Sequence, residues 1–384
     1  MNPMVFRNAR LVLPDEVRLG SLQVVNGCIE ALDSGALGQT GIDLEGDYLL
    51  PGLVEIHTDN LERHLLPRPK VHWAEMPALL AHDAELAASG ITTVFDALGV
   101  GDTEPDTLRG KNWERVLRCL DYCTTEGMLR ADHHLHVRCE LPAPNTVELF
   151  QPFHEHPRLG LISLMDHTPG QRQWEDLEHA RIYYTGKKGW SLERFQQQVA
   201  HAIESQARYA QPHRQHFVDY CRTHRIALAS HDDTTEAHVQ QAHQDGACIS
   251  EFPTTVAAAR SAHAHGMGTV MGGPNVVRGG SHSGNVAAAE LAQLGLLDIL
   301  SSDYVPGSLL SAAVRLVDEG ILSLPQAVAS VSRNPARACA LHDRGELRPG
   351  LRADLVHVRL LDLPGGGYRQ AVVRGVWREG QRVL

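Results

Sequence analysis

The sequence lacks the cysteine patterns of a disulfide framework or of a cysteine zinc site. Its seven cysteines are an odd number, lie scattered along the chain and include no Cys-x-x-Cys pair. No apolar run reaches the roughly 20 residues that a helix needs to cross a bilayer. The first residues, MNPMVFRNAR, contain no apolar signal core. We therefore expect a soluble cytoplasmic protein with reduced thiols and no membrane partner.

An excess of positive charge is also missing. The formal net charge is −11 with histidine counted as neutral. Because a nucleic-acid-binding surface needs clustered basic residues, we predict no nucleic-acid partner. A phosphorylated small substrate remains compatible with this charge, since a local basic pocket or a bound metal holds an anion on an acidic protein.

Both ends of the chain consist of short apolar segments separated by turn residues, which is the pattern of β-strands. We predict that residues 1–51 and 345–384 pair into one small satellite domain that resembles a β-sandwich.

The stretch between them, residues 52–344, alternates strand-like and helix-like segments and predicts an α/β fold. The eight strand candidates are LVEIH, ITTVFDA, HHLHVRCE, LGLISLMDH, IALASHDD, ACISEFP, GTVMGGPN and LDILSSDY. Several are apolar on both faces, as buried parallel strands are. Eight strands with intervening helices predict a distorted (β/α)₈ TIM-type barrel. An open doubly wound sheet is the alternative, and it is disfavoured because no GxGxxG loop follows the first strand.

One segment interrupts this alternation. Residues 171–222 are polar and helix-prone, and they contain no strand candidate. A helical insertion of this length is typical of a lid or of an oligomer contact, and both remain open. A homo-oligomer is therefore compatible with the sequence.

Six polar residues follow the ends of predicted strands, where a barrel carries its catalytic groups. They are His57, Asp59, Glu140, His167, His231 and Asp303. One such residue alone is usually a helix cap or a turn residue. Six of them, all imidazoles or carboxylates, instead predict a metal centre at the barrel mouth.

The run PGLVEIHTD, the later single histidines, the SSD near the end of the barrel and the C-terminal RPGLRADLV resemble the amidohydrolase superfamily over nearly the whole chain. Two positions depart from its usual pattern. The first-strand motif has Asp59 in place of a second histidine, and Glu140 stands where a carboxylated lysine is common. Both departures substitute a carboxylate and still allow two metals.

Longer stretches narrow the resemblance to one family. HTDNLERHLLPRP, MDHTPGQRQ, ASHDDTTEAHV and GGPNVVRGGSHSGNVAA are similar to the α-D-ribose 1-methylphosphonate 5-triphosphate diphosphatases of the carbon–phosphorus lyase pathway. The resemblance implies a phosphorylated ribose substrate, whose triphosphate is hydrolysed to the 5-phosphate and diphosphate in phosphonate catabolism. Residue spacing alone predicts only a metal-dependent hydrolase.

The six strand-end residues suggest two divalent ions. In this hypothesis His57, Asp59, Glu140 and Asp303 surround one ion, and Glu140, His167 and His231 surround the other. Asp303 is the candidate proton acceptor from the attacking water, with Asp232 and Asp233 as competitors. Zinc is the first choice, while Mn, Fe, Ni or Co also suit these ligands.

An anion site is expected beside the metals. Residues 272–285 form a predicted Gly-rich strand-end loop, in which glycines let backbone N–H groups approach phosphate oxygens. The candidate substrate-binding residues are Asn275, Arg278, Ser281 and His282 in this loop, with Arg68, Lys187 and Lys188 elsewhere. For the two lysines, a solvated loop tip is the competing interpretation.

Two other functions compete with this one. An amidohydrolase acting on a C–N bond, such as a deaminase or a cyclic amidase, would use the same metals but would not need an arginine in a Gly-rich loop. A barrel that only binds a ligand would not need the six candidate metal ligands.

Overall fold

The structure is a computed structural model, and it describes residues 3–33, 40–68, 71–101, 113–170, 172, 181, 191–281 and 284–384. The chain divides into two compact units. Unit 1 comprises residues 1–96, 119–134 and 271–384, and unit 2 comprises residues 97–118 and 135–270. Among the described residues, no helix combines the length and apolarity that a membrane span requires.

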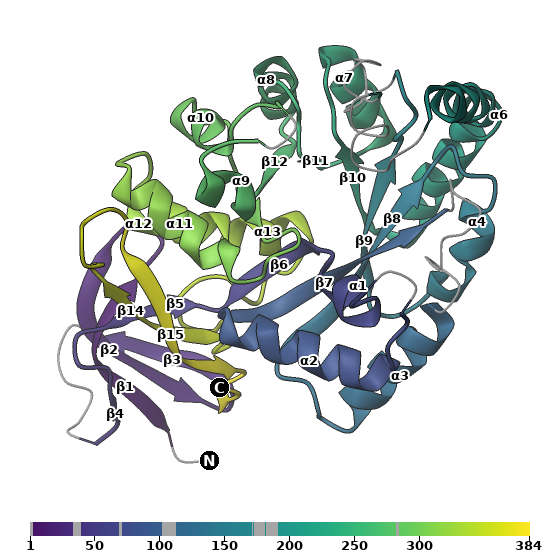
Figure 1. The fold of residues 1–384 in the computed structure, drawn as a ribbon. Helices are drawn as coiled ribbons and strands as arrows, with labels where there is room; N and C mark the ends of the chain where they lie inside the picture. The colour runs from purple at the N-terminus through teal and green to yellow at the C-terminus, as the bar shows by residue number, and fades with distance from the viewer. Residues whose placement is uncertain are drawn as a thin grey trace. The chain divides into compact units, whose positions relative to one another are not determined.

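The satellite sheet belongs to unit 1 and combines both ends of the chain (Figure 1). Its N-terminal strands are β1 (Met4–Val12), β2 (Val17–Val25), β3 (Cys28–Asp33), β4 (Ile42–Asp43) and β5 (Tyr48–Pro51). Its C-terminal strands are β14 (Leu355–Leu361), β15 (Gln370–Arg378) and β16 (Gln381–Arg382). Strand β14 pairs antiparallel with β5, with Leu355 opposite Pro51. Phe6 and Trp377 meet edge to face in its core, with ring centroids 4.8 Å apart.

The second sheet is parallel and nearly closed into a barrel, in the order β13-β12-β11-β10-β9-β8-β7-β6. Its strands are β6 (Leu53–Thr58), β7 (Ile91–Val100), β8 (Asp132–Glu140), β9 (Leu159–Met165), β10 (Ala227–His231), β11 (Ile249–Glu251), β12 (Gly268–Gly272) and β13 (Ile299–Ser301). A parallel bridge between Thr58 and Asp303 joins the two edges of the sheet. Strands β6 and β7 are buried on both faces, because a barrel strand has core on each side. The predicted barrel with a satellite sheet is confirmed. The predicted boundaries at residues 51 and 344 stay a prediction.

Helices connect the barrel strands and follow the last of them. They are α1 (Asn60–Leu65), α2 (Glu75–Ala88), α3 (Trp113–Thr125), α4 (Thr146–Leu149), the 3₁₀ turn η1 (Gln151–Phe153), α6 (Leu192–His224), α7 (Glu236–Asp245), α8 (Val256–Ala264), α9 (Gly273–Arg278), α10 (Ala288–Gln293), α11 (Ser308–Asp318), α12 (Leu324–Ser330) and α13 (Arg333–Ala338). Thr235 and Thr255 cap α7 and α8, and each side chain accepts the backbone N–H of the residue three positions further on.

The Gly-rich stretch 272–285 differs from its prediction as a loop. Residues 273–278 form helix α9. Pro274 lies in its first turn, where a missing N–H costs nothing, and Gly279 ends it with a φ of +83°. The glycines therefore bound a helix, and only the residues after 278 can form a loop.

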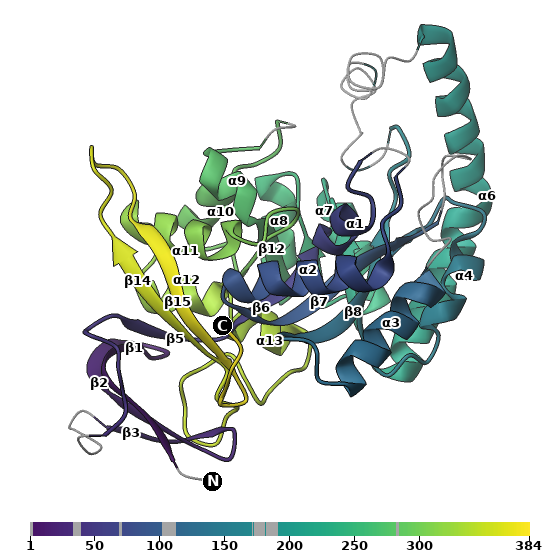
Figure 2. The same ribbon diagram turned by 60° about the horizontal axis from the view of Figure 1, so that its bottom comes forward.

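Helix α6 fills the second half of the predicted insertion and runs unbroken through 33 residues (Figure 2). Its C-terminal half packs on the rest of unit 2, where Phe217 meets Phe150 edge to face. Nearer its middle, Ser205 donates to the carbonyl of Pro142 and Gln206 donates to Asp166 over 3.0 Å. The helix thus braces the chain after β8 and after β9. Its predicted role as a lid or an oligomer contact remains a prediction.

Candidate metal centre

Three of the predicted ligands lie together in unit 1, and we call His57, Asp59 and Asp303 the first-strand group. The backbone joins the ends of β6 and β13 around them. Thr58 Oγ1 and the Asp59 N–H both donate to the Asp303 carbonyl, over 2.8 and 3.0 Å. The Asp303 N–H donates to the His57 carbonyl over 3.1 Å. This exchange holds two strand ends, far apart in the sequence, side by side.

Two features of the first-strand group distinguish it from ordinary strand ends. Asp59 occupies the N-cap position of α1, yet its side chain makes no capping hydrogen bond. Asp303 has a φ of +54°, in the left-handed region that non-glycine residues rarely adopt. Strained backbone of this kind concentrates at functional sites, where surrounding structure holds it. The capping role that a strand-end aspartate usually has does not apply to Asp59.

Glu55 supports this group from within the barrel and was not predicted. Its carboxylate is fully buried and accepts the backbone N–H groups of His57 and Ser302, over 2.6 and 2.5 Å. Burial raises the pKa of Glu55 to about 8, although both hydrogen bonds favour the charged form. The only signal in the sequence was an acidic residue inside the apolar run LVEIH.

Three further predicted ligands lie together in unit 2, and we call Glu140, His167, His231 and the adjacent Asp232 the histidine group. Glu140 bonds His167 twice, through the ring Nδ1 at 2.5 Å and the backbone N–H at 2.9 Å. Asp232 Oδ2 lies 3.8 Å from His167 Nε2 and 3.6 Å from His231 Nε2. The ligand atoms of His167, His231 and Asp232 all lie within 4.8 Å of one another, as in a metal site.

Burial and the close contacts between its members shift the pKa values of the histidine group. Burial alone would raise the pKa of Glu140, but His167 outweighs it and the net shift is downward. The pKa of His167 is correspondingly raised, because Glu140 and Asp232 outweigh the effect of burial. Burial raises the pKa of Asp232 to about 6. Asp232 also has a left-handed φ of +54°, as Asp303 does.

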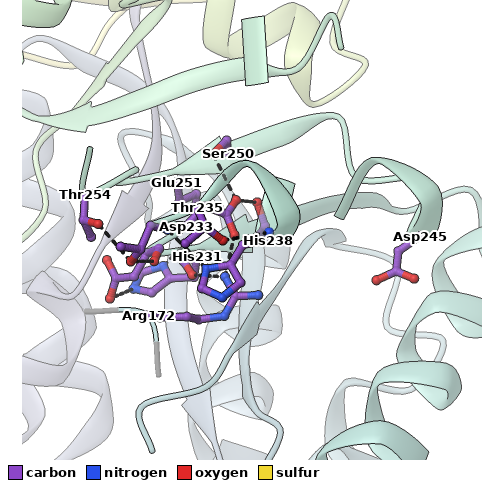
Figure 3. A network of polar contacts seen from close by, with 12 residues as sticks. Arg172, His231, Asp233, Thr235, His238, Asp245, Ser250, Glu251 and Thr254 are labelled. Carbon is purple, nitrogen blue, oxygen red and sulfur yellow. Dashed lines mark hydrogen bonds and ion pairs between the residues drawn. The ribbon is translucent and has the colours of Figure 1, made fainter. Parts of the chain in front are cut away.

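Asp233 has a different environment from its neighbour. Arg172, from the start of the insertion, donates to Asp233 Oδ1 over 2.5 Å and to the His231 carbonyl over 2.7 Å (Figure 3). Ser230 and Ser250 donate to the other carboxylate oxygen of Asp233. Asp233 is fully buried and committed to this network. Of the two competing proton acceptors, only Asp232 faces the histidines.

Glu251 and His136 were also missed by sequence reasoning. Glu251 ends β11 and lies 3.2 Å from His231 Nδ1, so that Nε2 is the ring nitrogen directed toward Asp232. His136 lies 3.8 Å from Glu251 and bonds Ser163 over 2.8 Å. Glu251 could have been found, since it is the carboxylate at the end of the predicted strand ACISEFP.

Gly101 packs closely against Glu140 and Thr146, where no side chain would fit. A Cβ at this position would clash with Thr146 Oγ1 and lie 2.9 Å from the Glu140 Cβ, and the φ of Gly101 is +101°. We expect Gly101→Ala to displace Glu140 and lower kcat/KM by about tenfold to a hundredfold. Steady-state kinetics measures this effect. Gly127→Ala, also at positive φ but with open space around it, is the control, and equal losses in both variants would contradict the prediction.

The predicted substrate-binding residues that the structure describes lie in and after α9 and after α1. Asn275 lies in α9, and its Oδ1 accepts the Ala288 N–H over 2.9 Å, so this side chain fixes the start of α10. Arg278 is exposed in the last turn of α9, Arg68 is exposed after α1, and Ser281 is half-buried. His282, Lys187 and Lys188 lie outside the described residues. Their assignment to substrate stays a prediction.

A second buried group of ligand-type side chains lies in unit 1, formed by His82, Asp96 and His133. Asp96 accepts from His82 Nε2 and from His133 Nδ1, both over 2.7 Å. His133 Nε2 reaches Asp83 at 3.3 Å, and Asp83 also accepts from Arg130. Burial would lower the pKa of His133, but the carboxylates of Asp96 and Asp83 raise it to about 9. His133 is therefore an imidazolium between two carboxylates.

This imidazolium makes stability depend on pH. A histidine whose pKa rises from 6.5 in the unfolded chain to about 9 in the folded one stabilises the fold fully below pH 6.5. The contribution, on the order of 3 kcal/mol, is lost as pH rises through 9. We expect the free energy of unfolding, measured with urea, to fall between pH 6.5 and 9. A His133→Gln protein should lose most of that slope, and an unchanged slope would contradict the assignment.

Comparison with known proteins identifies the family. The model of the Amidohydrolase family matches residues 192–384. The α-D-ribose 1-methylphosphonate 5-triphosphate diphosphatase of Escherichia coli (strain K12) is 49% identical over 99% of this chain and 100% of its own length. The chain belongs to the amidohydrolase family. As a member of it the protein is a hydrolase, and the predicted resemblance is confirmed.

Solved amidohydrolase-like structures agree on the fold. The 5-methylcytosine deaminase of Klebsiella pneumoniae has a TM-score of 0.64 at 17% identity, and covers 99% of this chain and 98% of its own. The dihydropyrimidinase of Brevibacillus agri NCHU1002 has a TM-score of 0.61 at 12% identity, and covers 100% of this chain and 95% of its own. At these identities the likeness shows the barrel and its satellite sheet, not the reaction.

Proposed function

We propose that this chain hydrolyses α-D-ribose 1-methylphosphonate 5-triphosphate to the 5-phosphate and diphosphate, in phosphonate catabolism. The observation that carries the proposal is the 49% identity to the E. coli diphosphatase across 99% of the chain. A barrel active site collects residues from the ends of several strands. An activity can therefore be inferred from a relative only when the similarity extends over the whole barrel.

We propose that one metal centre draws its ligands from both groups of strand-end residues, namely His57, Asp59, Glu140, His167, His231 and Asp303. The support is topological, because each residue lies at or just beyond the carboxyl end of a strand in one parallel barrel. The donor chemistry fits, since imidazoles and carboxylates suit divalent ions of borderline hardness. Two ions and zinc remain the first choice, and Mn, Fe, Ni or Co are compatible.

When bound, divalent ions lower the pKa of a nearby water and neutralise charge on phosphoryl oxygens. The chain's own residues supply the rest. The water oxygen forms a new P–O bond to a phosphorus atom of the α,β-bridge while the bridging P–O bond breaks, and diphosphate separates from the 5-phosphate. Asp303 accepts the proton from that water, held in its strained position by the Thr58 and Asp59 hydrogen bonds to its carbonyl. Asp232 is the alternative acceptor, and Asp233 is bound instead to Arg172.

Cationic side chains near the first-strand group suit the phosphate charges. Arg63, in α1, donates to the carbonyl of Tyr304, the residue after Asp303. It lines a pocket of about 550 Å³ together with His64, Trp73 and apolar side chains of α2. We propose Arg63 as an anion-binding residue in addition to the predicted Arg68, Asn275, Arg278, Ser281, His282, Lys187 and Lys188.

Phosphorus NMR of the products tests the reaction class. With the ribose 1-methylphosphonate 5-triphosphate and excess metal, we expect one equivalent of diphosphate and one 5-phosphate per substrate. Successive release of orthophosphate would contradict the proposal. So would ammonia release from a panel of cyclic amides and cytosine analogues with no turnover of the triphosphate, which would instead support C–N bond hydrolysis.

A further inference from the structure

The middle of helix α6 turns a polar face toward the rest of unit 2, where a surface helix usually has an apolar one. Residues three or four apart on a helix lie on the same side, and the half-buried residues on this side include Ser205, Gln206, Tyr209 and His213. Three of these side chains donate hydrogen bonds. The fourth, Tyr209, stacks on the His213 ring with centroids 5.7 Å apart. We call these four residues the polar stripe.

Two side chains of the polar stripe hold the chain that follows strand β8. His213 Nδ1 donates to the Leu141 carbonyl over 3.0 Å, and Ser205 Oγ donates to the Pro142 carbonyl over 2.9 Å. These carbonyls belong to the two residues directly after Glu140, the last residue of β8. Because a carbonyl only accepts, His213 carries a proton on Nδ1. The segment that leaves Glu140 is therefore fixed to a helix.

A third side chain of the stripe holds the chain after strand β9. Gln206 Nε2 donates to Asp166 Oδ2 over 3.0 Å, and the orientation of the amide follows because a carboxylate only accepts. The other oxygen of Asp166 accepts the Thr168 N–H over 3.1 Å, so the Asp166 side chain spans His167. The N–H of His167 itself donates to Glu140 Oε1 over 2.9 Å. The backbone on both sides of His167 is thus set by hydrogen bonds, and Gln206 anchors one of them.

Helix α6 has a separate set of contacts that stabilises its packing. In its C-terminal half, Phe217 and Tyr220 meet Phe150 edge to face, and Arg214 pairs with Asp245. A hydrogen bond from a half-buried neutral side chain adds little net stability, since water satisfies the same groups in the unfolded chain. It does fix distance and direction at its acceptor. The polar stripe therefore contributes more to geometry at the ends of β8 and β9 than to the stability of the helix.

We propose that Gln206 is a positioning residue for the metal ligand His167, acting through the Asp166 carboxylate, and that the polar stripe makes α6 a support of the metal centre. The inference rests on the proposed function, which makes His167 and Glu140 ligands. It gives the insertion a role that requires neither movement as a lid nor contact with a second subunit. Groups that orient metal ligands usually change metal affinity by ten- to a hundredfold when removed.

Reversing the hydrogen bond between Gln206 and Asp166 tests this role. In Gln206→Glu, two carboxylates face each other and the bond is lost. In Asp166→Asn, the Gln206 amide can turn over and accept from the new amide nitrogen, while the amide oxygen at position 166 still accepts from Thr168. In the double variant Gln206→Glu/Asp166→Asn, the amide at position 166 donates to the carboxylate at position 206. The bond is therefore broken in the first variant and restored, in reverse, in the other two.

The measurement is zinc affinity of the full-length apo protein, by competition with a chromophoric chelator, beside the melting temperature of the same metal-free sample. Gln206→Glu should bind zinc at least tenfold more weakly than the parent. Asp166→Asn and the double variant should bind it within about threefold of the parent. Gln206→Leu, which removes the donor without adding a charge, should weaken zinc binding as Gln206→Glu does.

Two control variants lie on the same helix. Gln215→Glu adds the same charge to an exposed glutamine that donates to an aspartate, Asp219, over 2.9 Å. It should leave zinc affinity unchanged. Arg214→Met breaks the largely buried pair with Asp245 and should lower the melting temperature more than Gln206→Glu does, again with zinc affinity unchanged.

Zinc affinities that follow the melting temperatures, with Arg214→Met as the weakest binder, would overturn the inference. Equal zinc binding by Gln206→Glu and Gln215→Glu would do the same, as would a double variant no better than Gln206→Glu. His167→Ala distinguishes this failure from failure of the proposed function. If His167→Ala binds zinc more weakly while Gln206→Glu binds it as the parent does, only the positioning role is wrong. If His167→Ala binds zinc as the parent does, the proposed ligand set itself is wrong.

Discussion

Replacing His231 by alanine is expected to lower kcat/KM by at least a thousandfold, equivalent to about 4 kcal/mol of transition-state stabilisation. His231 is almost fully buried, and Glu251 at its Nδ1 leaves Nε2 directed toward Asp232. His167, which is bound to Glu140 through Nδ1, contributes its own Nε2 to the histidine group, so loss of His231 removes a separate ligand nitrogen. Kinetics at saturating metal, together with metal content by plasma mass spectrometry, checks the prediction.

The matched control for this variant is His243→Ala. His243 lies on the exposed face of α7, in the same unit, and stacks on His265 with ring centroids 4.5 Å apart. We expect its loss to leave kcat/KM and metal content unchanged. A His231→Ala protein that kept both its bound metal and its activity would remove His231 from the ligand set.

The second large effect is on stability. Arg172→Met removes the cation from a buried pair and leaves the Asp233 carboxylate inside unit 2 with only two serine hydroxyls. Breaking a buried ion pair from one side costs about 3–5 kcal/mol, because the remaining charge is desolvated and uncompensated. Urea unfolding measures this loss. Activity should fall as well, since Arg172 also holds the carbonyl of His231.

Two further variants test whether the unpaired Asp233 carboxylate causes the loss of stability in Arg172→Met. In the Arg172→Met/Asp233→Asn double variant no charge is left unpaired, so we expect part of the lost stability to return. Arg214→Met breaks another largely buried pair of unit 2, with Asp245 at 2.5 Å, and should reduce stability without changing kcat/KM. A double variant no more stable than Arg172→Met would contradict the buried-charge explanation.

The strands of the barrel could be predicted because each depends on a local signal. Buried parallel strands are apolar on both faces, and each of the eight predicted segments overlaps a strand of the parallel sheet. Polar residues at the end of such a run, such as His57 and His231, could be selected from the sequence as candidate metal ligands. Glu55 and Asp96 lie inside their runs, and nothing local distinguishes a buried acid held by hydrogen bonds from an exposed one.

Helix α9 and Arg172 show where local signals fail. The glycines around Pro274 predict a loop by composition, yet a proline in the first turn and a glycine after the last are also how a short helix is bounded. Arg172 lies in a polar segment, and its importance comes from Asp233, which is 61 positions further along the chain. A partner at that separation is set by the tertiary fold and leaves no trace in the spacing of residues.

The pairing of β5 with β14 has a consequence for synthesis. Pro51 leaves the ribosome some 300 residues before Leu355, its partner across the satellite sheet. While the barrel is translated, β14 has not yet been made, and the backbone edge of β5 that it will pair with remains exposed. Such an open edge is a template for pairing with other chains. Nascent chains stalled before residue 355 should thus associate with chaperones, or with each other, more readily than the released protein does.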